Sequence, residues 1–287
     1  MTEAVIYNDP NKYSTGALQP VPVPVIKTPS FNRHYGKHDV LDGEYTLTQK
    51  LLGEFLGTML FVYGVCCSNV FGRYYDEYDL YLGNSPACKI IGSCCMGGVI
   101  IYIFGRISGA HFNPAVSLGL FLRHKLSAME LGLYIIAQII GGFVGCVLLG
   151  LCRRAKFQKM AGNSISEHLI DDLGNGKKTG WCYVSAFLFE IFGTMILVLF
   201  ILASCERDNY LGPTLGLAFS SVLIALSGIG GNVSGCSLNP ARSFGPALMQ
   251  VIAGGDKDPI KQIWIYLVGP LLGAVIAAFL WPIFIYA

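Results

Sequence analysis

The tripeptide Asn-Pro-Ala occurs twice in this sequence, and each copy stands inside the same longer phrase. The first phrase is SGAHFNPAV at residues 108–116, and the second is SGCSLNPAR at residues 234–242. Both phrases lie between long apolar segments, so they predict a duplicated protein in which two copies of one polar element enter a membrane. The motif residues are Asn113, Pro114, Ala115, Asn239, Pro240 and Ala241.

The composition excludes an ordinary soluble domain. Of the 287 residues, 53% are hydrophobic and only 13% are charged, whereas soluble domains carry about 25% charged residues. The apolar surface must therefore be buried in a lipid bilayer. The net charge of +2 gives no basis for a nucleic-acid partner. Because the ten cysteines lack the paired spacing of metal ligands, we expect neither a metal site nor a cofactor.

Six apolar segments are long enough to cross a hydrocarbon core of about 30 Å, which takes about 20 helical residues. Two further apolar segments, 113–122 and 239–251, are too short to cross. The sequence therefore predicts an all-α membrane protein with six transmembrane helices and two half-helices that re-enter the membrane. We place the six spans near residues 50–71, 87–106, 127–151, 181–204, 212–231 and 261–284.

Each short segment carries a strong signal for the start of a helix. Asparagine is a good N-cap, and proline suits the first helical position because its missing N–H would be unpaired there anyway. The residue before a proline is pushed out of the α region, so we expect extended backbone ahead of each motif. Irregular backbone at membrane depth is tolerated only inside protein or beside a water-filled cavity. The two half-helices therefore predict a pore.

The two halves of the chain repeat each other. The phrase EFLGTM begins at Glu54, and the similar phrase EIFGTM begins at Glu190. Each half has three spans, and three is odd, so the second half must enter the membrane inverted. We place the first repeat at about 47–151 and the second at about 180–287, within a channel domain of residues 47–287. Residues 1–46 are polar and predict a flexible cytoplasmic tail.

Two half-helices that enter from opposite faces would meet near the middle of the membrane. Their N-termini bring partial positive charge to that point, and the side-chain amides of Asn113 and Asn239 add hydrogen-bond donors. The positive field repels cations and protons. Carbonyls of the backbone ahead of each motif add acceptors. This arrangement suits a small neutral solute that forms hydrogen bonds. With no nucleophile–base set in view, we expect no enzyme activity.

These phrases make the chain resemble the aquaporin family (major intrinsic proteins) over residues 47–286. The resemblance implies a passive channel for water, with one pore per subunit, assembled as a homotetramer in the lipid bilayer. It also implies cytoplasmic termini, in the plasma membrane or an internal vesicle membrane. Six basic residues in the connection 152–180 oppose that orientation by the positive-inside tendency, so the orientation rests on the resemblance.

The resemblance also implies a selectivity ring. Arg242 and Cys236 match family positions within the second motif. Counting 20 residues back from Asn113 gives Ser93 (113 − 20), and counting 12 back from Asn239 gives Ser227 (239 − 12). Water-selective members have Phe and His at the last two positions, and glycerol-conducting members have aromatic and small residues. The serines match neither set and predict a wider ring with extra hydroxyls, open to glycerol, urea or ammonia. Ser243 follows Arg242, where glycerol-conducting members usually have Asp, which favours the water-type branch.

Other residues allow two interpretations each. Glu54 and Glu190 are either braces for the re-entrant loops or a proton relay, which would make the protein a proton-coupled transporter. His111 either fixes its loop by a hydrogen bond or serves as a pH gate. Ser127 either caps the third span or is phosphorylated to gate the pore, and the tail could close it. A third alternative is a structural, junction-forming membrane protein. The sequence assigns no role to the connection 152–180.

Overall fold

The computed structural model describes residues 45–71, 86–154, 156–205 and 214–286, and every regular element in these ranges is a helix. The described residues belong to one unit that begins at Tyr45, so most of the predicted tail lies outside them. The helices are α1 (Leu47–Phe71), α2 (Pro86–Ser108), α3 (Pro114–Leu122), α4 (Ala128–Cys152), α5 (Glu167–Gly174), α6 (Gly180–Ser204), α7 (Leu215–Gly230), α8 (Pro240–Ile252), α9 (Asp258–Lys261) and α10 (Ile263–Tyr286).

Five helices in the described ranges are long and apolar enough to cross a membrane: α1, α2, α4, α6 and α10. The predicted fifth span, 212–231, corresponds to α7, which has 16 residues. A helix of that length is about 24 Å long, shorter than the hydrocarbon core. Its predicted start falls in residues 206–213, which lie outside the described ranges. Large apolar side chains on these helices remain exposed, as expected of surfaces that face lipid; they include Tyr102, Leu217, Phe279 and Phe284.

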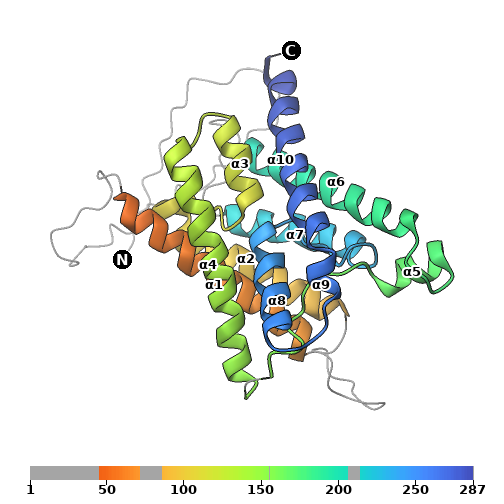
Figure 1. Ribbon diagram of the computed structural model, residues 1–287. Coiled ribbons are helices and arrows are strands. Elements are labelled where there is room, and N and C mark those ends of the chain that lie inside the picture. The colour runs from red at the N-terminus through yellow and green to blue at the C-terminus, as the bar shows by residue number, and fades with distance from the viewer. Residues whose placement is uncertain (1–44, 72–85, 155, 206–213, 287) are drawn as a thin grey trace, which may run out of the picture. The chain divides into compact units, whose positions relative to one another are not determined.

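The helix contacts repeat between the two halves. Helix α1 packs along α4, and α6 packs in the same way along α10. Contact between α2 and α7 joins the halves. Each half-helix also packs against the last long helix of the other half, α8 against α4 and α3 against α10 (Figure 1). This exchange of partners ties the two repeats together around the half-helices.

The predicted half-helices are confirmed as α3 and α8. Each begins at the proline of its motif, after an asparagine in extended backbone. The Asn113 Oδ1 accepts a hydrogen bond from the N–H of Ala115 at 2.9 Å, and the Asn239 Oδ1 accepts one from Ala241 at 2.9 Å. Asparagine and proline thus start each helix through local chemistry.

Glycine allows α2 and α7 to approach closely. A methyl group on Gly98 would lie 2.3 Å from the carbonyl oxygen of Gly216, and one on Gly216 would lie 2.4 Å from the carbonyl oxygen of Gly98. Both obstacles are backbone atoms, which cannot move without separating the helices. Contact of this kind between small residues is the usual basis of helix association in membranes.

We expect Gly98→Ala to lower the stability of the folded protein by about 1–3 kcal/mol, the usual cost of overpacking. The matched control is Gly105→Ala on the same helix, where an added methyl group would meet nothing within 4 Å. That change should leave stability unchanged or raise it by about 0.5–1 kcal/mol, since alanine favours helix more than glycine does. Thermal unfolding in detergent measures both, and equal midpoints for the two variants would contradict the close approach.

Candidate functional site

A buried carboxylate seats the loop ahead of the first half-helix. Glu54 on α1 is fully buried and its Oε1 accepts from the Ser108 hydroxyl at 2.6 Å and from the His111 N–H at 3.0 Å. Its Oε2 accepts from the Phe112 N–H at 2.8 Å and from the Gln138 side-chain amide at 2.8 Å. Four donors therefore converge on one carboxylate, from the loop and from α4.

The second loop is seated in the same way by Glu190 on α6, which is also fully buried. Its Oε1 accepts from the Ser234 hydroxyl at 2.6 Å and from the Ser237 N–H at 2.9 Å, and its Oε2 accepts from the Leu238 N–H at 2.8 Å. The structure thus places both acidic side chains against the backbone N–H groups of the re-entrant loops.

The backbone ahead of each motif is not simply extended, which corrects the sequence-based expectation. The capping asparagines are extended, but six loop residues have positive φ: Gly109, Ala110, Phe112, Gly235, Cys236 and Leu238. The rule for residues before proline acts on one residue alone. The positive φ values of the other loop residues are explained by the buried carboxylates. Backbone N–H groups that bind one anion together line a concave turn, called a nest, and such a turn uses left-handed backbone.

The side chains of the two motif asparagines link the loops to each other. The Asn113 Nδ2 donates to the carbonyl of Leu238 at 2.8 Å, and the Asn239 Nδ2 donates to the carbonyl of Phe112 at 2.8 Å. Each amide has a second N–H, since Nδ2 carries two hydrogens. Both asparagines line a cavity of about 30 Å³ together with Phe61, His111 and Phe219. That volume holds at least one water, which needs about 10–15 Å³.

The four residues predicted to form a ring lie together. Ser93, Ser227, Cys236 and Arg242 all line a cavity of about 50 Å³, and all four also line a wider cavity of about 520 Å³. The Ser93 hydroxyl donates to the carbonyl of Lys89 at 2.7 Å, so its hydrogen is used within its own helix. The Ser227 hydroxyl lies 3.6 Å from the Cys94 thiol. Ser93 therefore offers a solute only an acceptor, not the donor that an unpaired hydroxyl would add.

Phe61 is an aromatic residue beside the ring that the sequence did not single out. Phe61 on α1 lines both the 30 Å³ and the 50 Å³ cavities. Phe112 lines the 30 Å³ cavity, whereas two other aromatic residues of α1, Phe55 and Tyr63, line neither of the two. No local pattern marks Phe61, because α1 carries apolar residues on every side in the sequence. The signal comes only from packing against α7 and the second loop.

The connection after α4, to which the sequence assigned no role, borders the same path. Residues 161–168 line the 520 Å³ cavity. The Arg242 guanidinium, only 5% exposed, donates from Nη1 to the carbonyl of Ala161 at 3.2 Å. Asn163 donates from Nδ2 to the carbonyl of Gly235 at 3.1 Å and accepts from the Ser243 hydroxyl at 2.8 Å. The connection is thus fixed to the second loop and to α8.

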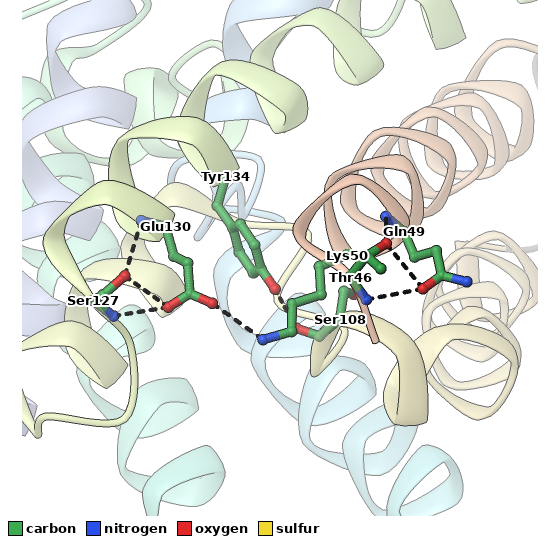
Figure 2. A network of polar contacts seen from close by, with 7 residues as sticks. All are labelled: Thr46, Gln49, Lys50, Ser108, Ser127, Glu130 and Tyr134. Atoms are coloured by element: carbon green, nitrogen blue, oxygen red, sulfur yellow. Dashed lines mark hydrogen bonds and ion pairs between the residues drawn. The ribbon is translucent and has the colours of Figure 1, made fainter. Parts of the chain in front are cut away.

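The two remaining predicted residues, His111 and Ser127, line neither of the cavities that the ring residues share. The His111 Nδ1 lies 3.0 Å from the Ser117 hydroxyl, and its ring meets that of Tyr134 edge to face. Ser127 caps α4 in a reciprocal box with Glu130. Glu130 pairs with Lys50 at the start of α1 at 3.1 Å, and Figure 2 shows this chain of contacts beside Tyr134 and Ser108. Ser127 and His111 therefore lie outside the ring.

Comparison with known proteins identifies related channels. The family described as "MIP: Major intrinsic protein" matches residues 43–281. Nodulin-26 of Glycine max is 30% identical over 235 residues, which cover 82% of this chain and 77% of that protein. Aquaporin AqpM of Methanothermobacter marburgensis is 33% identical over 261 residues, covering 81% and 96%. The structure resembles that of the aquaglyceroporin from Plasmodium falciparum with a TM-score of 0.63, 22% identity, and coverage of 81% and 94%.

Proposed function

Because the chain belongs to the major intrinsic protein family, we propose that it is a passive pore for water that also admits small neutral solutes such as glycerol, urea or ammonia. Family membership makes it an integral membrane channel and not an enzyme. The observation that supports the proposed solutes is the pair of capped half-helices whose asparagines border one cavity. Donors meet there in a space large enough for a water molecule.

The same geometry supports exclusion of ions and protons. Two helix N-termini carry about half an elementary positive charge each, and the Arg242 guanidinium adds a full positive charge at the ring. A cation would have to pass both without a carboxylate to replace its water, because no described Asp or Glu lines the 30 Å³ or the 50 Å³ cavity, and Glu54 and Glu190 are fully buried and hydrogen-bonded to the loops. A neutral solute meets no such barrier.

The solute range follows from the size of the ring. Ser93 and Ser227 are small, which favours solutes larger than water, while Phe61 restores some bulk. Ser243, which binds Asn163, is a neutral residue directly after Arg242. We therefore propose a water channel of the water-type branch with a ring that also passes small polyols or urea.

Two other functions have less support. A proton-coupled transporter would need Glu54 or Glu190 to exchange protons with the path, yet the backbone N–H groups of the loops occupy their oxygens. A structural, junction-forming protein would need an adhesive surface outside the membrane. The long connection instead folds back onto the second loop and α8.

We also propose a homotetramer with both termini cytoplasmic, on the basis of the family resemblance. Phosphorylation of Ser127 would act through its neighbours, since a phosphate at that cap would repel Glu130 and compete for Lys50. The link between α1 and α4 would then change at the proposed cytoplasmic end. A gate formed by the tail involves residues 1–44, which lie outside the described ranges.

Vesicle swelling tests the proposed function. Purified protein in lipid vesicles should raise the rate of water entry after an osmotic step to well above that of empty vesicles, with no accompanying proton leak. Glycerol and urea gradients then measure the solute range. If the full-length protein, a Ser127→Glu form and a form without residues 1–44 all match empty vesicles, the proposal is wrong.

A further inference from the structure

The arginine of the ring is held by a backbone atom from the connection after α4. The contact from Arg242 Nη1 to the Ala161 carbonyl is the only hydrogen bond that the guanidinium donates to the described residues. Ala161 itself has positive φ, 55°, a conformation that an alanine adopts only where its surroundings impose it. The position of the guanidinium therefore depends on whatever holds residue 161.

One side chain holds both neighbours of Ala161. The Gln250 Oε1 on α8 accepts from the Met160 N–H at 3.1 Å and from the Gly162 N–H at 2.9 Å. Gln250 is only 4% exposed, so these bonds do not compete with bulk water. With the N–H groups on both sides directed at Gln250, the peptide between them has little freedom to turn its carbonyl away from Arg242.

Gln250 and the two N–H groups that it accepts from, those of Met160 and Gly162, form a clamp that is tightly packed. A methyl group on Gly162 would lie 3.0 Å from the Gln250 Oε1 and 2.8 Å from the Pro259 Cβ. Gly255, just past the end of α8, similarly approaches the backbone of Gln158, where an added methyl group would lie 2.2 Å from the carbonyl oxygen. The connection is thus packed against the end of α8 on both sides of Ala161.

We propose that Gln250 is a positioning residue for selectivity, which fixes the Ala161 carbonyl as the acceptor that holds the Arg242 guanidinium at the wall of the ring. This inference rests on the proposed function for its effect on solutes, and on the contacts alone for its effect on the guanidinium. Without the clamp, the carbonyl can turn and the guanidinium is free to enter the lumen.

The test compares two glutamines of the same kind. Gln250→Met keeps the length of the side chain and removes the acceptor. Gln262→Met is the matched control. Gln262 is 2% exposed and accepts at 2.8 Å from the N–H of Ile165, a residue of the same connection that does not adjoin Ala161. Gln250→Glu retains the acceptor, and Gly162→Ala opens the clamp without changing Gln250.

The first measurement is the rate at which phenylglyoxal, a neutral reagent for arginine, labels Arg242 in full-length protein, mapped by peptide mass spectrometry. We expect Gln250→Met and Gly162→Ala to raise that rate about fivefold, the factor that one hydrogen bond is worth. Gln262→Met and Gln250→Glu should label at the rate of the unchanged protein. Equal rates for Gln250→Met and the unchanged protein, or equal increases for both methionine variants, would overturn the inference.

The second measurement is the ratio of glycerol to water permeability in vesicles, which Gln250→Met should change and Gln262→Met should not. In an Arg242→Leu protein, the same Gln250→Met change should have no further effect, because its effect passes through the guanidinium. A further change in that protein would count against the inference. Should the unchanged protein pass no water, the proposed function fails, while the labelling rates still decide the role of Gln250.

Discussion

Glu190→Ala is expected to abolish water permeation. The change leaves the N–H groups of Ser237 and Leu238 and the hydroxyl of Ser234 without their acceptor. Each unpaired polar group in a buried site costs about 1–3 kcal/mol, and the carboxylate also maintains the positive φ of the loop. The second asparagine would then leave its position opposite Asn113. We expect water flux at the rate of empty vesicles, together with a lower unfolding temperature in detergent.

Two further variants make this prediction specific. Asp172→Ala removes an exposed acid from α5 and should change neither flux nor stability. Glu190→Gln retains one acceptor oxygen but directs an NH₂ group at the loop donors, so we expect an intermediate loss of both. A proton-coupled transporter would behave otherwise, since Glu190→Gln would abolish a voltage-driven current that the unchanged protein carries. Full water flux through Glu190→Ala would show that the carboxylate does not support the loop.

Ser93→Phe combined with Ser227→His should remove the flux of larger solutes while water continues to pass. Both serines line the 50 Å³ cavity beside Arg242, so aromatic side chains at both positions would fill most of that space. We expect glycerol and urea permeability to fall by at least about tenfold, which corresponds to about 1.4 kcal/mol in the barrier. Water should fall much less, because one water needs only about 10–15 Å³.

The control for the ring is a double substitution of the same kind outside it. Ser68 lies on α1 and Ser221 lies on α7, the helix that carries Ser227, and each hydroxyl donates to a carbonyl of its own helix. Neither residue lines any of the three cavities described above, of about 30, 50 and 520 Å³. Ser68→Phe combined with Ser221→His should leave the ratio of glycerol to water permeability unchanged. Unchanged ratios in the Ser93 and Ser227 variant would show instead that these residues do not set the solute range.

Features that depend on neighbours in the chain were predictable from the sequence. The half-helices start at Pro114 and Pro240 because an asparagine cap and a proline act within one helical turn. The long spans follow from runs of apolar residues, and α7 is the exception, with 16 helical residues in the part of its segment that the structure describes. The internal repeat also correctly paired Glu54 with Glu190 as residues of equivalent position. The prediction of extended backbone ahead of the motifs was wrong. The rule for the residue before a proline covers one residue, and it cannot describe a loop that curls around a carboxylate from a distant part of the chain.

The sequence by itself determined that this chain spans a membrane and bears two capped half-helices, because hydropathy and capping are local properties. The tertiary structure alone decided that Phe61 lines the 50 Å³ cavity and that the Ser93 hydroxyl donates within its own helix. It also decided that Gln250 and Ala161 hold Arg242. The clamp joins residues about 80–90 positions apart. Contacts over such separations depend on how helices pack and leave no periodic signal in the chain.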